Sequence, residues 1–250
     1  MLSKETAFRI TRKAVAPVLR TLAWYRYDSI ILFGICQYSK CKFGGGIMNK
    51  VITYIDGLNL YYGLCDAGWR KYLWLNVQKM AESLLMINQE LVMTKYFTAI
   101  VINDTEKQAR QTRYLEALET LNYFKVFKGE FLPEPRECPN CKCIENIPKE
   151  KMTDVNIAVE MLSDAYCNSF DIALLISADT DFVPVVEAIR NNFDKKRIII
   201  CFPPKRFSDH LKDIAHAYYH IGKSHFARSL LPPKVTRDDG YILECPATWA

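Results

Sequence analysis

Four aspartates stand beside the ends of apolar runs, where a parallel sheet would gather them for metal chemistry. In open parallel sheets, ligands bind beyond the carboxyl ends of the strands, so these side chains are expected at one sheet edge. Crowded carboxylates repel one another, and a divalent cation relieves the repulsion. Mg²⁺ or Mn²⁺ prefers oxygen ligands, lowers the pKa of bound water and polarises a phosphoryl oxygen, so a phosphodiester is the expected substrate. The four residues are Asp56, Asp154, Asp179 and Asp181.

Each of these acids also has a simpler structural explanation. Asp56 precedes Gly57 and could be an ordinary turn residue. Asp154 could serve only the N-terminal end of a helix dipole. Asp179 and Asp181 could cap a helix, although capping explains one of them and not both. Four acids at one sheet edge together favour the metal site over these separate explanations.

Polar and basic residues near the same edge are candidates for substrate binding. Asn59 and Ser177 lie within the acidic motifs, although Asn59 could instead cap the turn after the first strand. Lys205 and Arg206 follow a later strand and could hold phosphates of the substrate; the alternative is that they are solvated surface cations. Further residues that could contact such a substrate are Arg110, Arg113, Lys149, Lys151, Tyr61, Tyr62 and Trp69.

The elements that would position these residues alternate between strand and helix. This alternation predicts an α/β fold with a mostly parallel sheet and helices on both faces. The expected strands are 51–55, 95–102, 123–132, 171–176 and 196–202. The expected helices are 77–87, 105–122, 153–167, 181–192 and 208–218, with a turn or short helix at 58–64. Thr153 is the expected N-cap of the helix that carries Asp154, and residues 133–149, rich in Pro and Cys, are expected to form a loop.

That loop contains a second candidate metal site. Cys138, Cys141 and Cys143 include a Cys-x-x-Cys pair, which is half of a zinc site, but structural zinc takes four ligands. The fourth ligand could be Cys36 or Cys41, a residue of a second subunit, or nothing. The alternative is a loop with incidental thiols.

The positive charge of the chain is confined to its N-terminal segment. Residues 1–47 hold eight basic and two acidic residues, so the remaining residues carry a net charge of −1 although the whole chain carries +5. Bulk charge is therefore no argument for RNA binding by the rest of the chain. The segment could be a targeting peptide or a basic arm; we favour a segment that is disordered or not translated, and expect it to be dispensable.

Composition excludes several other classes. The 10 Gly and 11 Pro among 250 residues exclude collagen and a low-complexity protein. The apolar stretch at residues 30–36 is far shorter than the roughly 20 residues that span a bilayer. Nine cysteines, an odd number, without a signal peptide favour a reducing compartment, so we expect a cytoplasmic protein that has no membrane contact.

Residues 54–60, 153–158 and 175–182 form three motifs whose order and spacing are more specific than any one of them. Together they resemble the signature blocks of the NYN domain family, stand-alone bacterial members of the PIN-like nuclease superfamily. The resemblance implies a Rossmann-like three-layer sandwich and a Mg²⁺- or Mn²⁺-dependent ribonuclease. Asp56, Asp154, Asp179 and Asp181 match the acidic positions of the family, and Asn59 its polar position. Ala178 stands where the family often has Gly, which is a mild departure.

The resemblance also implies how the chain divides into domains and which other function competes with RNA cleavage. It covers residues 48–235, preceded by the extension 1–47 and followed by a tail, 236–250. The rival to an RNA-cleaving enzyme is a nuclease-like module that binds RNA or a protein and has little catalytic activity. Four mutually repelling carboxylates argue against a pure binder, because binding alone does not need them. A homo-oligomer is compatible with the sequence.

Overall fold

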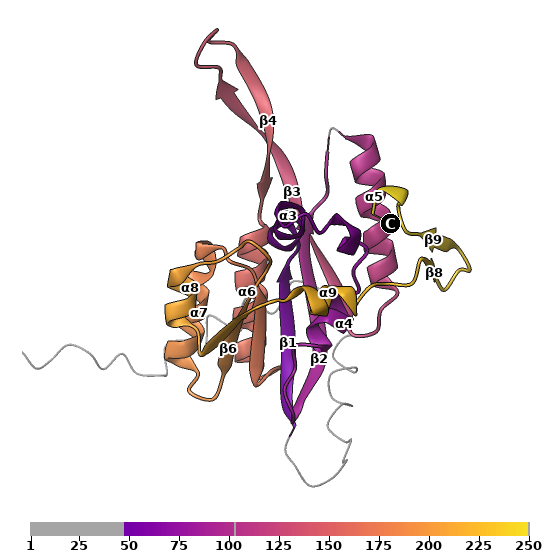
Figure 1. Cartoon of the computed structure of the whole chain (residues 1–250). Helices are drawn as coiled ribbons and strands as arrows, with labels where there is room; N and C mark the ends of the chain where they lie inside the picture. The colour runs from indigo at the N-terminus through magenta and orange to yellow at the C-terminus, as the bar shows by residue number, and fades with distance from the viewer. Residues whose placement is uncertain (1–47, 103, 250) are drawn as a thin grey trace, which may run out of the picture. The chain divides into compact units, whose positions relative to one another are not determined.

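The computed structural model describes residues 48–102 and 104–249 and places them around one seven-stranded sheet (Figure 1). Our expectations for residues 1–47 lie outside the described residues. The strands are β1 (Asn49–Asp56), β2 (Gln89–Ala99), β3 (Phe124–Glu137), β4 (Ile144–Lys151), β5 (Ile172–Ile176), β6 (Arg197–Phe202) and β7 (Ala217–His220). Their order is β4-β3-β2-β1-β5-β6-β7; β4 is antiparallel to β3, and the other six strands are parallel.

The strand β1 lies in the middle of the sheet because its residues are apolar on both faces. It pairs in parallel with β2 on one side and with β5 on the other. Val51 and Ile55 belong to one apolar core, and Ile52 and Tyr54 belong to the other. Asp56 is the last residue of β1, so its carboxylate is held at the carboxyl edge of the sheet, between two neighbouring strands.

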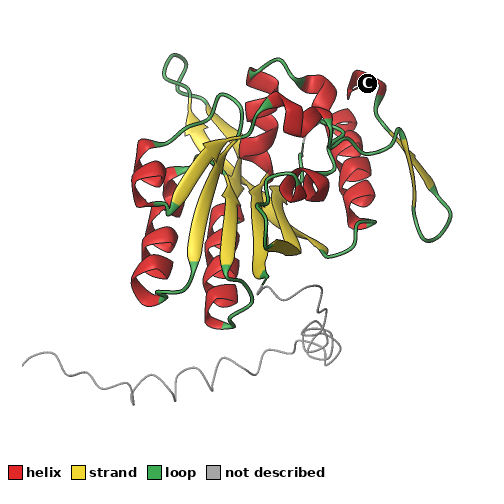
Figure 2. Cartoon of the chain, turned by 60° about the horizontal axis from the view of Figure 1, so that its bottom comes forward, coloured by secondary structure: helices red, strands yellow, loops and turns green. Residues whose placement is uncertain are grey.

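Helices cover both faces, so the predicted three-layer α/β fold is confirmed; Figure 2 shows the two helical layers. One layer packs against Val51 and Ile55 and contains α3 (Gly57–Asp66), α4 (Val77–Glu82), α5 (Thr105–Glu119) and α9 (Lys223–Ala227). The other contains α6 (Thr153–Tyr166), α7 (Val183–Asn192) and α8 (Asp209–Ile214). Short 3₁₀ turns are η3 (Arg70–Tyr72), η4 (Thr180–Phe182) and η5 (Ala247–Trp249).

A partly buried ionic network, centred on the buried ammonium of Lys95, fixes α6 against the sheet. The ammonium of Lys95 on β2 lies 2.6 Å from Glu160 and 2.5 Å from Asp164, both on α6. The hydroxyl of Tyr54 on β1 donates a hydrogen bond of 2.5 Å to the same Asp164 carboxylate. Burial, followed by the charge and hydrogen bond of Asp164, raises the pKa of Tyr54 well above its ordinary value, so this side chain remains a donor. The network sets the position of the helix whose first turn carries Asp154.

The expected loop at residues 133–149 is wrong, because most of this segment forms a β-hairpin. β3 continues beyond the parallel sheet to Glu137 and pairs with β4 as an antiparallel ribbon, which projects from the sheet in Figure 1. Pro133 lies opposite Pro148 in this ribbon. Proline has no N–H to donate and is tolerated in a strand that has a free edge, so the proline content misled the sequence prediction.

Several further boundaries differ from the prediction. The helix expected at 77–87 ends at Glu82, and the strand expected at 95–102 is Gln89–Ala99. The helix expected at 208–218 ends at Ile214, and β7 follows it as an edge strand paired with β6. Pairing with the sheet therefore overrides helical propensity at the end of this segment. The N-cap of α6 is Met152, in the left-handed region at φ 77°, rather than Thr153, which is the first helical residue.

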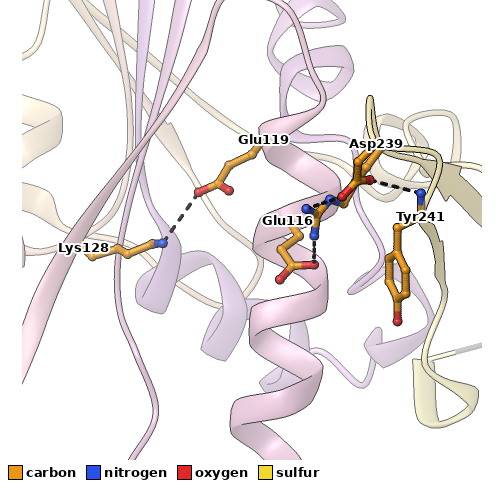
Figure 3. A network of polar contacts seen from close by, with 6 residues as sticks. Glu116, Glu119, Lys128, Asp239 and Tyr241 are labelled. Atoms are coloured by element: carbon orange, nitrogen blue, oxygen red, sulfur yellow. Dashed lines mark hydrogen bonds and ion pairs between the residues drawn. The ribbon is translucent and has the colours of Figure 1, made fainter.

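The C-terminal residues pack against α5. β8 (Lys234–Thr236) and β9 (Ile242–Glu244) form a small antiparallel hairpin. The guanidinium of Arg237 lies 3.1 Å from Glu116 on α5 and 2.8 Å from Asp239 in the hairpin turn (Figure 3). The ring of Trp249 lies edge-on to Tyr114 on α5, with 5.8 Å between the centroids. Charged and aromatic contacts therefore both hold the tail on this helix.

Candidate active site

Donors from two segments of the chain hold the carboxylate of Asp56. Its side chain is the N-cap of α3: Oδ1 accepts a hydrogen bond of 3.0 Å from the backbone N–H of Asn59. Oδ2 accepts a hydrogen bond of 2.9 Å from the hydroxyl of Ser177, just after β5. Only 5% of the residue is exposed. The sequence offered an ordinary turn residue as the alternative at this position; the structure shows that Asp56 caps α3 and also accepts a hydrogen bond from the residue after β5.

A chain of hydrogen bonds extends from Asp56 into the turn after β5. The Ser177 hydroxyl that donates to Asp56 also accepts from the backbone N–H of Asp179, at 3.1 Å. Oδ1 of Asp179 accepts from the N–H of Asp181 at 3.0 Å. From the β1 side, the side-chain oxygen of Asn59 accepts from the N–H of Ala178 at 3.3 Å. The residues predicted from the two motifs therefore form one connected cluster, with Asp179 half-buried and Asp181 exposed.

Asp154 approaches the same sheet edge from α6. It lies in the first turn of that helix and is half-buried. Lys151, the last residue of the preceding strand β4, pairs with Glu130 on β3. The residue before Glu130 is Gly129, which pairs with the last residue of β2. The first turn of α6 thus begins at the level where the parallel strands end.

The donor set suits a hard divalent cation that keeps part of its water shell. All the predicted ligands are carboxylates, which Mg²⁺ and Mn²⁺ prefer. In the described part of the chain, the three clustered cysteines are the only group of three or more acidic, His or Cys side chains whose ligand atoms all lie within 4.8 Å of one another. No three of the four aspartates therefore have ligand atoms within this distance of one another.

Gly57 is required by the close approach of α3 to β2, a feature that the sequence prediction missed. A Cβ at this position would lie 2.5 Å from Cζ and 2.6 Å from Oη of Tyr96, and 2.7 Å from the carbonyl oxygen of Phe97. Burial, and then the negative charge of Asp56, raises the pKa of Tyr96 above its ordinary value. The Tyr96 ring therefore lies beside the acidic cluster, on the α3 side of the sheet.

We expect Gly57→Ala to destabilise the fold by about 1–3 kcal/mol, because the new methyl group overlaps a backbone oxygen as well as a side chain. The same displacement would move Asp56, so activity should fall as well. The measurement is the free energy of unfolding in denaturant. Gly222→Ala is the matched control: its Cβ would meet no atom closer than 3.9 Å. Equal stability of the two variants would contradict the close approach.

The two cations predicted after β6 differ in their surroundings. Arg206 is ion-paired with Asp66, the last residue of α3, while Lys205 is exposed, with a left-handed backbone at φ 58°. A Cβ on Gly63 would lie 2.7 Å from the carbonyl oxygen of Pro204, so this loop packs tightly on α3. Arg206 therefore fastens the loop to α3, and Lys205 is the cation of the pair that stays exposed to solvent.

A cavity of about 520 Å³ lies on the α3 side of the sheet edge. Its walls come from α3, the end of β2, α5 and the C-terminal residues. Three cations, Arg70, Lys107 and Arg110, also line it. The aromatic residues in its walls are Tyr61, Tyr62, Tyr96, Tyr114, Phe131 and Trp249. No sequence pattern indicates this cavity, because its walls come from segments far apart in the chain.

The cysteine cluster lies at the tip of the β3–β4 hairpin. The ligand atoms of Cys138, Cys141 and Cys143 lie within 4.8 Å of one another. The tip is closed by backbone hydrogen bonds from Cys138 N–H to the Cys143 carbonyl and from Lys142 N–H to the Cys138 carbonyl. A hydrogen bond from Cys143 lowers the pKa of Cys141 to about 7, which favours the thiolate that binds metals. The predicted grouping of the three thiols is present in the structure.

Comparison with known proteins gives three results. The NYN domain matches residues 50–222. The 6-hydroxy-3-succinoylpyridine 3-monooxygenase HspA of Pseudomonas putida (strain DSM 28022 / S16) is 30% identical to this chain. The alignment covers 56% of this chain and 55% of that protein, so this chain spans about half the length of that relative. The crystal structure of VPA0982, a protein of unknown function from Vibrio parahaemolyticus RIMD 2210633, is 22% identical, with a TM-score of 0.49, over 76% of this chain and 100% of that one.

In the described part of the chain, no helix has the length and apolar character needed to cross a membrane. The family match extends from the start of β1 to the residue before α9, and so includes all four aspartates and the cysteine cluster. The chain belongs to the NYN domain family.

Proposed function

We propose that this protein is a metal-dependent ribonuclease that hydrolyses phosphodiester bonds of RNA at the Asp56 cluster. The observation that carries the proposal is the hydrogen-bonded connection from Asp56 through Ser177 to Asp179, which joins the ends of two neighbouring parallel strands. Acidic groups gathered at that position of an α/β sheet are suited to hold a cation against a phosphate. Family membership supports a nuclease-like activity.

The chain would supply the ligands and their orientation. The oxygen ligands would come from Asp56, Asp154, Asp179 and Asp181, and bound Mg²⁺ or Mn²⁺ would activate water and stabilise charge on the phosphate. Ser177 and Asn59 hold the two loops together, so they position the acids rather than contact the scissile bond. Lys205 would attract the RNA backbone at the same sheet edge. The residues from 48 onward carry a net charge of −1, so we expect RNA binding to depend only modestly on salt.

The test is an assay on a pool of structured and single-stranded RNAs, with Mg²⁺ or Mn²⁺ and with EDTA as the control. We expect cleavage with either metal and none in EDTA. RNA binding without cleavage under all metal conditions would instead support the binding module without catalysis. EDTA-resistant cleavage would contradict the metal site. The free thiols of the described residues suit the reducing cytoplasm, where we place this activity.

A second candidate function comes from the monooxygenase relative and is favoured by the cavity. The name of that relative specifies a substituted pyridine as its substrate. The aromatic and cationic lining of the cavity suits a small aromatic acid. Oxygen uptake in the presence of a reduced nicotinamide and a hydroxypyridine tests this function. If oxygen uptake depended on the pyridine and RNA stayed intact, the monooxygenase function would replace the nuclease proposal.

The cysteine cluster is proposed to bind Zn²⁺ through its three thiols, with a fourth ligand from another part of the protein, from a second copy or from solvent. We expect Cys141→Ser to lower the zinc content of the purified protein by at least about half, because one of the few strong ligands is lost. The measurement is metal analysis after dialysis. Cys167→Ser is the matched control, since Cys167 is an exposed thiol on another element. Equal zinc contents in the two variants would contradict the site.

A further inference from the structure

We infer that the cavity between α3 and α5 binds one nucleotide of the RNA strand, with the base against aromatic rings and the phosphate at Arg110. The inference rests on the proposed function, because it extends the cleavage site to a neighbouring nucleotide. The cavity volume of about 520 Å³ lies within the range of roughly 300–1,000 Å³ typical of small-ligand sites.

The aromatic lining is suited to a flat ring. Tyr61 and Tyr62 come from α3, Tyr114 from α5 and Trp249 from the C-terminal residues. Tyr62 is 53% exposed, so its ring is accessible to a ligand. Stacking on such rings accepts any base, since every base has a π-face. The cavity should therefore bind purine and pyrimidine nucleotides with similar affinity.

The cationic lining is suited to an anion. Three basic side chains line the cavity, and among the residues that the structure describes no acidic one does. Arg110 is paired with Glu106 only at 3.5 Å, and the Glu106 side chain is 89% exposed, so water weakens this contact. The guanidinium can therefore exchange Glu106 for a phosphate, to which it would donate paired hydrogen bonds.

The position of the cavity connects it to the acidic cluster. Gly57, directly after Asp56, lies in the cavity wall. Tyr96, which touches Gly57, is in the same wall and is close enough to Asp56 for the carboxylate charge to raise its pKa. A strand with one nucleotide in the cavity would consequently place an adjacent phosphodiester near Asp56. Trp249 closes the cavity from outside the range matched by the NYN domain, so the tail contributes to substrate binding.

The experiment is a fluorescence titration of the full chain in EDTA with uridine and adenosine 5′-monophosphates and with uridine alone. We expect saturable quenching of tryptophan emission by both nucleotides, and weaker binding of the nucleoside. Tyr62→Ala and Arg110→Ala should each raise the Kd by about tenfold. Trp249→Phe should remove most of the quenching while binding persists in a calorimetric titration.

The controls separate the cavity from the rest of the surface and from catalysis. Tyr166→Ala and Arg197→Ala remove an exposed aromatic residue and an exposed cation near the opposite edge of the sheet and should leave the Kd unchanged. Asp179→Asn should also bind nucleotide normally, so loss of cleavage and loss of binding are distinguishable. Three results would each overturn the inference, even if metal-dependent cleavage is found. They are the absence of saturable binding, a Kd that neither cavity variant changes, and binding of pyridine-3-carboxylate without binding of any nucleotide.

Discussion

Asp179→Asn is expected to lower the metal-dependent rate of RNA cleavage by about 100-fold, while the protein stays folded. Loss of one carboxylate weakens cation binding and transition-state stabilisation, and about 3 kcal/mol of lost stabilisation corresponds to this factor. The asparagine side-chain oxygen can still accept the hydrogen bond that Asp181 N–H donates to Asp179, so the turn is retained. Removing one of several neighbouring negative charges should leave the melting temperature unchanged or raise it.

The comparison requires cleavage rates at saturating Mn²⁺ and thermal unfolding of the same preparations. Asp194→Asn is the matched control, because Asp194 is an exposed acid in the loop that precedes β6. It should leave both quantities unchanged. Cleavage by the Asp179 variant at the wild-type rate would exclude Asp179 as a metal ligand, and a large fall in melting temperature would mean that its role is structural.

Lys95→Met is expected to lower the free energy of unfolding by about 3–5 kcal/mol. Met fills a similar volume but leaves Glu160 and Asp164 without the buried ammonium that lies within 2.6 Å of both. For a protein of this size, such a loss lowers the melting temperature by roughly 6–20 °C. Cleavage should also weaken, because the network sets the position of the helix that carries Asp154.

A double variant separates charge from packing. Adding Asp164→Asn to Lys95→Met removes one unpaired carboxylate and should recover part of the lost stability, whereas independent effects would add. Lys195→Met, at an exposed position, should change the free energy of unfolding by less than about 0.5 kcal/mol. If Lys95→Met lowered the free energy of unfolding no more than this control does, the network would not anchor α6.

The central strands and the acids were predictable because their signals are local. β1 and β5 are apolar runs that end at polar motifs, and the carboxyl ends of parallel strands meet at one edge. What the motifs could not give was the link between them. The hydroxyl of Ser177 joins Asp56 to Asp179, and this contact depends on the pairing of strands far apart in the chain. The sequence predicted that the acids lie at one edge of the sheet, but it did not predict the distances between them.

The missed features depend on long-range packing. Prolines in the β3–β4 hairpin resemble those of a loop, and only the pairing with the opposite strand makes the segment regular. Lys95 in a strand resembles an ordinary surface cation until α6 supplies two acids. The cavity requires the tail to reach α5, which the Arg237 contacts make possible and no sequence motif indicates.

The distance along the chain between the two halves of the acidic site has a consequence during synthesis. Asp56 and Ser177 are 121 positions apart, so Asp56 leaves the ribosome long before the strand that completes its surroundings. β1 can pair early with β2, but β5 becomes available only after the hairpin and α6 have been made. Because such non-local pairing forms late, a nascent chain has the first acid without its partners. Under the proposed function, the protein cannot cleave its own messenger while β5 is still unmade.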